Sequence, residues 1–213
     1  MLDTILDSPL SQWLCQDTEA TDHIVISSRI RLARNFDDIL FTNREDTVSL
    51  EKSEYNLSRP IANIKKRLMS TNIQIFSLEQ LSQCERAVLV EKHLMSPALE
   101  EQLPYRNLIV SDDASIAIMV NEEDHLRIQS MAPGLKLQQA IIMRFKLIKL
   151  SKQNTLMPLM SDFGYLTACP TNVGTGLRAS VMLHLPALTL SGRITRLIRN
   201  IIQLGYSVRG VVW

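Results

Sequence analysis

Hydrophobic residues along this chain follow two different periods, and the change between them predicts a mixed architecture. Apolar runs of strand length occupy residues 24–28, 107–110, 115–120, 126–131, 177–185 and 206–212. In the fifth run Ala179, Val181 and Leu183 take every second position, as expected for a strand with one covered face. Helical spacing predicts helices over residues 1–13, 47–69, 78–93, 135–152 and 193–204, the last ending near Gly205.

Short connections between the expected strands favour antiparallel pairing. Only Ser111-Asp112-Asp113 and one further residue separate runs 107–110 and 115–120, a spacing consistent with a hairpin. Parallel neighbours need a long crossover, which these connections do not allow. We therefore predict an α/β (α+β) fold, a largely antiparallel sheet flanked by helices, forming one domain over residues 1–213.

Composition restricts the class of protein. The 213 residues are 46% hydrophobic, enough for one substantial core. No apolar run reaches the length of a membrane-spanning helix, and the acidic N-terminus lacks the basic start of a secretory signal. Cys15, Cys84 and Cys169 are widely spaced, without a zinc pattern, which fits reduced thiols. These features predict a cytoplasmic protein without a membrane partner.

The net charge of +1 conceals an uneven distribution. Residues 1–124 hold 21 acidic and 12 basic residues, a balance of −9, whereas residues 125–213 hold one acidic and 11 basic residues, a balance of +10. A positive half can bind nucleic acid or a polyphosphate, or simply attract the acidic half. Aromatic residues do not interleave with the basic positions, so a nucleic-acid partner is disfavoured.

The segment from Cys169 to Arg178 concentrates chemistry that a core element does not need. It reads CPTNVGTGLR and combines a thiol, hydroxyls, an amide, an arginine and two glycines. Gly174 and Gly176 permit sharp turns and close backbone approach, while the polar groups suit phosphate or another anion. Taken alone, such a loop is usually a simple turn.

Two further segments change that interpretation. In SSRIRLARN, a strand would place Arg29 and Arg31 on one face, where their charges repel unless an anion lies between them. The alternative is a solvated edge strand. In NEEDHLR, three consecutive acids follow an apolar strand. They form either a solvated turn or a site for a cation, a guanidinium or the metal of a nucleotide.

These segments resemble the phosphagen (guanidino) kinase family, and most closely its protein arginine kinase branch. The matching text is SSRIRLARN, NEEDHLRIQSM, GYLTACPTNVGTGLRASVMLHLPAL and, near the end, YSVRG. The similarity extends over nearly the whole chain and is weakest at residues 136–161. Family enzymes that act on small phosphagens carry a helical domain before the first arginine motif. Because that motif begins here at Ser27, the resemblance favours the protein arginine kinase branch.

The resemblance implies ATP-dependent phosphorylation of arginine side chains in proteins, with Mg²⁺ held mainly by the nucleotide phosphates. Glu123 would hold the reactive guanidinium, Glu122 would support the metal through water, and Cys169 would lie near the substrate. The residues implied on the nucleotide side are Ser28, Arg29, Arg31, His93, Arg127, Arg178, Ser180 and Arg209. His125 and His184 are interpreted as structural.

This assignment answers a chemical need. A guanidinium is cationic with a pKa above about 12, so its nitrogen is a poor nucleophile. A fixed carboxylate can orient it and accept a proton as the new bond forms. The transferring phosphoryl group also spreads negative charge over its oxygens, which arginines and a metal ion neutralise.

The resemblance further implies an activator zinc protein, a heat-shock repressor substrate, a Clp ATPase and a homodimer as partners. Alternatives remain open. One is a catalytically weak or inactive truncated remnant that acts as a binding module. A second is a kinase for free guanidino compounds, and a third is a nucleic-acid binder.

Two departures from the family pattern lead to further expectations. Family members continue past the Val-Arg-Gly segment with a second glutamate in a loop, and the protein arginine kinases add a region that recognises phosphoarginine. We therefore expect a C-terminally truncated chain with little kinase activity alone. Residues 141–160 contain four basic residues and no acid, where the family has an acid-bearing helix. This predicts a locally altered reading frame.

Overall fold

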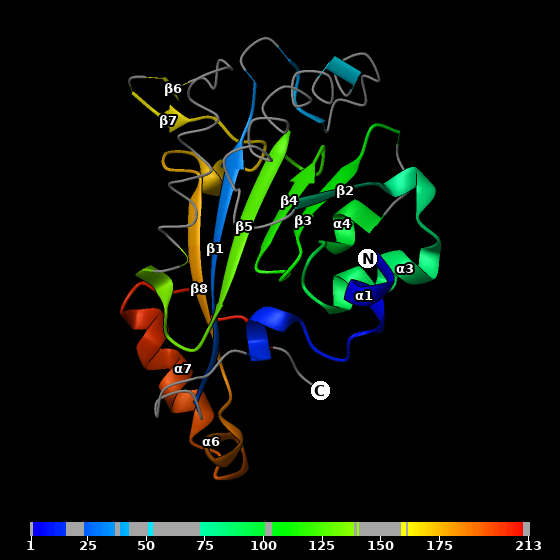
Figure 1. Cartoon of the computed structure of the whole chain (residues 1–213). Coiled ribbons are helices and arrows are strands. Elements are labelled where there is room, and N and C mark those ends of the chain that lie inside the picture. The colour runs from blue at the N-terminus through cyan, green and yellow to red at the C-terminus, as the bar shows by residue number, and fades with distance from the viewer. Residues whose placement is uncertain are drawn as a thin grey trace.

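A six-stranded sheet in which every strand pairs with its neighbour antiparallel forms the frame of the protein. The computed structural model describes residues 2–15, 24–36, 39–42, 51–52, 73–100, 104–138, 140, 159–160 and 162–210. The strand order is β2-β3-β4-β5-β1-β8, as Figure 1 shows. The strands are β1 (Val25–Arg34), β2 (Ile73–Ser77), β3 (Asn107–Ser111), β4 (Ile116–Val120), β5 (Leu126–Pro133) and β8 (Leu177–Leu183).

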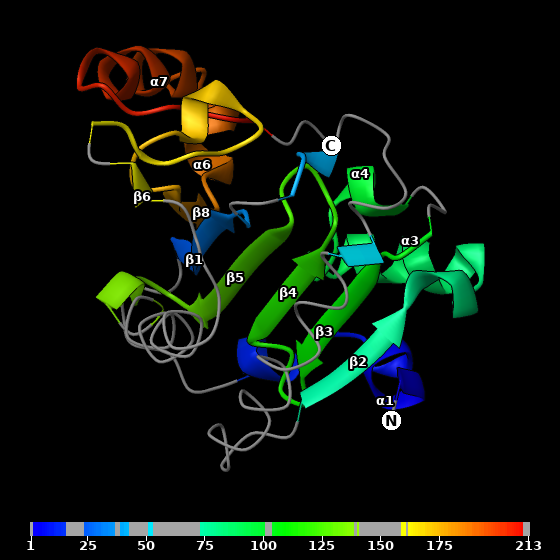
Figure 2. The ribbon, with the colours of Figure 1, turned by 90° about the horizontal axis from the view of Figure 1, so that it is seen from above.

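Helices gather at the two ends of the sheet (Figures 1 and 2). Near β2 and β3 lie α1 (Leu2–Asp7), α3 (Gln83–Glu91) and α4 (Pro97–Glu100). Near β8 lie α6 (Pro186–Leu190) and α7 (Ile194–Gln203). Short 3-10 helices occupy Gln12–Cys15, Leu78–Gln80 and Pro170–Asn172, and a small hairpin joins β6 (Leu159–Met160) to β7 (Gly164–Tyr165).

Two hydrophobic cores cover opposite faces of the central strands. Leu108, Val110 and Met119 pack with α1, α3 and α4 residues such as Leu89 and Leu99 in the helix-side core. The second core contains the alternate residues Ile109, Ile116, Ile118, Leu126 and Ile128 on the other face. Because β3 and β4 are buried on both faces, they form the rigid centre of the molecule.

The predicted antiparallel sheet flanked by helices is confirmed, including the β3–β4 hairpin and the helix that ends before Gly205. The prediction for residues 78–93 was wrong at its start, because α3 begins only at Gln83. Ser82 accepts a hydrogen bond from the Glu85 amide, and the Glu85 carboxylate accepts one from the Ser82 amide. This capping box fixes the first turn of α3.

Other differences concern strand limits. The expected strand over 206–212 was wrong for residues 206–210, which are exposed and have no regular structure. Strand β2 was not predicted, although Ile73–Ser77 pairs with β3 along its length. The helix expected over 47–69 lies outside the described residues except for 51–52, which are helical. The helix expected over 135–152 falls within the described residues only at 135–138 and 140. Of these, residues 137, 138 and 140 are helical.

None of the helices in the described ranges is long and apolar enough to cross a membrane.

The two-sided burial of β3 leads to a stability prediction. Leu108 is fully buried in the helix-side core, so Leu108→Ala should lower the free energy of unfolding by about 2–5 kcal/mol. Ile75 on β2 is 45% exposed, and Ile75→Ala should cost less than about 1 kcal/mol. Urea unfolding monitored by circular dichroism measures both; equal losses would contradict this account of the core.

Candidate functional site

Strand register brings four arginines onto one face of β5, β1 and β8. Arg31 lies between Gln129 and Arg178, and Arg29 lies between Met131 and Ser180. Arg127 pairs with Ala33 one step further along the same face. Residues directly opposite in antiparallel strands have Cβ atoms about 4.5–5.5 Å apart. The prediction that Arg29 and Arg31 share a face is therefore confirmed.

These arginines act on one another electrostatically. Burial, followed by the positive charges of Arg29, Arg127, Arg178 and Arg209, lowers the pKa of Arg31 to about 9. Burial and the charges of Arg127, Arg178 and Arg209 also lower the pKa of Arg29. Arg209, which follows α7, thus joins the other four in what we call the arginine cluster: Arg29, Arg31, Arg127, Arg178 and Arg209.

The arginine cluster has more positive charge than its surroundings neutralise. Within the part of the chain that the structure describes, Arg127 alone among the five forms a salt bridge with a carboxylate. The Nε atom of Arg31 is buried and has no hydrogen-bond partner. A buried unsatisfied donor costs about 1–3 kcal/mol, and more when charged. Bound anionic oxygens would relieve both the repulsion and the missing hydrogen bond.

The acidic turn between β4 and β5 closes one side of the arginine cluster. Glu122 is buried, and its Oε1 accepts hydrogen bonds from Arg127 Nη1 and Ser96 Oγ, each at 2.5 Å. Burial alone would raise the pKa of Glu122. The hydrogen bond and charge of Arg127, with hydrogen bonds from Ser96 and the Glu123 backbone, outweigh burial and lower it. Glu122 is therefore ionised and orients Arg127.

The neighbouring Glu123 differs from Glu122 in its environment. Its side chain is exposed, and no described residue pairs with its carboxylate. Thr42 Oγ1 donates to the backbone carbonyls of Glu122 and Glu123, both at 2.7 Å, which fixes the turn. Glu123 is thus held at its backbone and available at its carboxylate.

The last residue of the acidic turn, His125, has a structural role. His125 is fully buried; its Nδ1 accepts from the Phe36 amide at 3.1 Å and its Nε2 lies 2.8 Å from the Leu40 carbonyl oxygen. A ring that accepts at one nitrogen and donates at the other is neutral. Burial lowers the pKa of His125, against the opposing effects of the Leu40 carbonyl and Asp124. The structural interpretation of His125 is confirmed.

The loop that contains Cys169 is anchored to β1. The Ala33 amide donates to the Gly176 carbonyl at 2.8 Å, and Arg34 Nη1 donates to the Thr175 carbonyl at 3.1 Å. The Arg34 guanidinium also stacks on the Tyr165 ring, 3.5 Å from its centre. Gly176 has φ +58, and a Cβ there would lie 2.8 Å from the Ala33 carbonyl oxygen, so only glycine fits.

Two further predicted residues, Cys169 and His93, make hydrogen bonds within the described structure. Cys169 Sγ lies 3.0 Å from Thr171 Oγ1, the neighbour expected beside it. His93 follows α3 with φ 58, and its carbonyl accepts from Gln129 Nε2 at 2.6 Å, in the same row as Arg31. Burial and the charge of Arg29 lower the pKa of His93, which places its ring beside the arginine cluster.

One predicted nucleotide-side residue does not join the cluster. Ser28 pairs with Val181 and Ala132, so its side chain points to the face opposite Arg29. It is fully buried, where its Oγ donates to the Gly134 carbonyl at 2.7 Å and accepts from the Lys136 amide at 3.1 Å. Ser180, by contrast, lies opposite Arg29 on the cluster face.

Sequence reasoning missed several residues that hold this site together. Asn35 lies in the motif SSRIRLARN and Asp124 in NEEDHLRIQSM, so the family resemblance could have indicated both residues. Ser96 accepts from the Leu99 amide at the start of α4 as well as donating to Glu122. Its only sequence signal was its place before Pro97, typical of a helix N-terminus.

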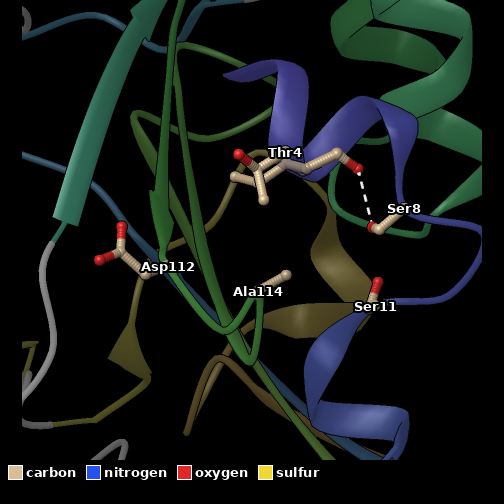
Figure 3. A pocket seen from close by; sticks show the side chains of 6 residues that line it. Thr4, Ser8, Ser11, Asp112 and Ala114 are labelled. Atoms are coloured by element: carbon tan, nitrogen blue, oxygen red, sulfur yellow. Dashed lines mark hydrogen bonds between the residues drawn. The ribbon is translucent and has the colours of Figure 1, made fainter. Parts of the chain in front are cut away.

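Figure 3 shows a small cavity between the N-terminal residues and the β3–β4 turn. Residues from α1 and the chain after it, including Thr4 and Ser8, face Asp112 and Ala114 across it. Its volume of about 10 Å³ holds a single water molecule. Among the described residues, no group of three or more His, Cys, Asp and Glu side chains could hold a metal ion.

Comparison with known families identifies the source of this arrangement. Residues 57–212 match the family described as "ATP:guanido phosphotransferase, C-terminal catalytic domain". The chain belongs to this family. The match includes the acidic turn, the Cys169 loop and three of the clustered arginines, Arg127, Arg178 and Arg209.

Relatives of this ATP:guanido phosphotransferase chain include two proteins named protein-arginine kinase. That of Symbiobacterium thermophilum is 43% identical over 94% of this chain and 57% of its own length. That of Caldanaerobacter subterraneus subsp. tengcongensis is 44% identical over 88% of this chain and 56% of its own length. The chain thus spans little more than half the length of these relatives.

Solved structures of guanidino kinases share the fold. The substrate-free duplicated taurocyamine kinase from Schistosoma mansoni superposes with a TM-score of 0.69 at 21% identity, covering 88% of this chain and 30% of that one. A lombricine kinase structure gives a TM-score of 0.66 at 22% identity, covering 88% of this chain and 58% of that one.

The buried neutral His125 leads to a pH prediction. Its pKa is lower in the folded than in the unfolded protein, so its contribution to stability is present above about pH 6.5 and is lost as pH falls. His125→Gln should reduce the slope of unfolding free energy between about pH 7 and pH 5, by at most about 1.4 kcal/mol per pH unit. Urea titrations at several pH values measure it. The exposed His184, changed to Gln, serves as the control; an unchanged slope in His125→Gln would contradict the assignment.

Proposed function

We propose that this chain forms the catalytic domain, over residues 1–213, of a kinase that transfers the γ-phosphoryl group of ATP to arginine side chains in proteins. The arginine cluster is the observation that carries this proposal, because its charge and its unpartnered Arg31 Nε need a polyanion. The relatives named protein-arginine kinase support arginine residues of proteins as the acceptors.

On the nucleotide side, Arg29, Arg31, Arg127, Arg178 and Arg209 would bind the phosphates. One guanidinium group can donate two parallel hydrogen bonds to the oxygens of a phosphate. Phosphoryl transfer depends mainly on such positioning and on charge neutralisation. Bound ATP supplies the phosphoryl group, with Mg²⁺ carried on its phosphates. Glu122 keeps Arg127 in place through the 2.5 Å hydrogen bond, while its support of the metal through water follows from family resemblance. His93 would contact the nucleoside, a role that follows from family resemblance.

On the acceptor side, Glu123 and Cys169 would hold the arginine. The exposed Glu123 carboxylate can bind a guanidinium through two nitrogens and take up the proton released as the phosphorus–nitrogen bond forms. The sulfur of Cys169 would help to position the same guanidinium from the side opposite Glu123. A heat-shock repressor, an activator zinc protein and a Clp ATPase are the proposed partners, in the cytoplasm.

The arginine cluster predicts opposite effects of one substitution in the absence and presence of nucleotide. Arg31→Met removes one repelling charge and the unpartnered Nε, so the free protein should gain up to about 1–3 kcal/mol of unfolding free energy. The wild type should gain about 2.7 kcal/mol at an ATP concentration of 100 Kd, and the variant much less. Thermal unfolding with and without ATP measures both effects. Equal stabilisation of both proteins by ATP would contradict the phosphate site.

Transfer itself depends on Glu123. After incubation with ATP, Mg²⁺ and an arginine-rich protein substrate, the wild-type chain should produce a small but measurable amount of acid-labile phosphoarginine, in keeping with its expected low activity alone, and Glu123→Ala should reduce it by about 10²-fold or more. Mass spectrometry under non-acidic conditions measures the product, with Glu79→Ala, an exposed acid at the β2 end, as control. ATP-dependent stabilisation without phosphoarginine would favour the binding module. Product on free arginine only would favour a free-guanidino kinase.

A further inference from the structure

We propose that Asp124 is a positioning residue that sets the separation between Glu123 and Cys169, the two groups assigned above to the acceptor arginine. The role deepens the proposed function and rests on it. Asp124 itself does not reach the acceptor, because its side chain is buried, 3% exposed, among backbone and amide groups.

One oxygen of Asp124 joins three segments that are distant in the sequence. Its Oδ1 accepts from Asn35 Nδ2 at 2.6 Å and from the Ala168 amide at 2.7 Å. Asn35 directly follows β1, and Ala168 belongs to the loop after β7. Because Asp124 follows Glu123 and Ala168 precedes Cys169, this one hydrogen bond connects the immediate neighbours of both acceptor groups.

Asn35 completes the connection. Its Nδ2 also donates to the Leu166 carbonyl at 3.1 Å, and its Oδ1 accepts from the His125 amide at 2.8 Å. The Asn35 side chain, 4% exposed, therefore bonds to both residues after Glu123 and to the loop before Cys169. Through Asn35 and Asp124, the acidic turn and the Cys169 loop are held at fixed positions on β1.

The chemistry of the position favours a carboxylate over an uncharged acceptor. No described residue forms a salt bridge with Asp124, so its charge is supported by hydrogen-bond donors. Burying a carboxylate in this way costs free energy, but bonds from N–H groups to a charged oxygen are about twice as strong as neutral ones. The resulting stiffness matters here, since misplacement of a reacting group by about 1 Å can cost about 10²-fold in rate.

The thiol of Cys169 reports on this positioning without requiring kinase activity. In a variant that carries Cys15→Ser and Cys84→Ser, Cys169 is the one cysteine that remains of the three in the chain. Its alkylation by iodoacetamide should accelerate about five- to tenfold in Asp124→Ala. Losing one hydrogen bond raises the population of the open loop by about that factor, and the open loop exposes the thiol. Asp124→Asn keeps an acceptor oxygen but loses the charge, so its rate should rise only about two- to threefold.

A matched control separates local positioning from general loss of stability. Asp113 also organises a turn, accepting from Ser111 Oγ at 2.6 Å and from the Ser115 amide at 3.1 Å, but it lies at the opposite end of β4. Asp113→Ala should leave the alkylation rate of Cys169 unchanged. Equal acceleration in Asp113→Ala and Asp124→Ala, or none in either, would overturn the proposal.

A second measurement does not depend on Asp124→Ala and covers the case in which that variant fails to fold. The Ala168 amide lies outside every described helix and strand, and among the described residues its hydrogen-bond acceptor is Asp124, so its protection from solvent exchange reports on that bond. Hydrogen exchange by NMR should show it protected in the wild type and less so in Asp124→Asn; exchange at the rate of a free loop amide would overturn the proposal. Where transfer is measurable, Asp124→Asn should raise KM for the protein substrate and leave KM for ATP unchanged. A protected Ala168 amide without phosphoarginine formation would reject the proposed function and keep the positioning role.

Discussion

Repulsion between guanidinium groups is the interaction on which the rest of this structure depends. The sheet places Arg31 directly opposite Arg178, an arrangement that destabilises an antiparallel pair. The protein tolerates it because the centre of the sheet is buried on both faces and supplies stability independent of the arginines. A site for a highly charged ligand thus lies next to a core that does not need the ligand in order to form.

The acidic turn controls this repulsion without cancelling it. Glu122 neutralises Arg127, the member of the arginine cluster on β5, and ties it through Ser96 to the start of α4. The remaining arginines keep their charge directed at the open face. Glu122, Glu123 and Asp124 are consecutive, yet they differ in burial and partners. The first orients an arginine, the second is free at its carboxylate and the third is bonded to backbone and amide groups.

Sequence patterns predicted the parts of this fold that depend on local order. Apolar runs located β1, β3, β4, β5 and β8, and the two-residue period of a strand placed Arg29 and Arg31 on one face. The same two-residue period places Ser28 on the opposite face from Arg29. The family motif had grouped Ser28 with the nucleotide-side residues, so at this position the motif was misleading and the strand period was correct. The burial of the acidic turn was not predictable, because its partners Asn35 and Ala168 come from distant segments. Residues 206–210 were predicted as part of a strand but are exposed and have no regular structure.

The register of the strands limits where residues can be inserted or deleted. A strand tolerates no change of length between its charged positions, because one inserted or deleted residue would turn its remaining side chains over to the opposite face. In β1 such a change after Ser28 would exchange Arg31 with Ile30 and Leu32, carrying a charge into the hydrophobic interior and an aliphatic chain to the ligand face. Insertions and deletions are therefore expected to be tolerated only in the connections, while the strands that bear arginines must keep their spacing residue for residue.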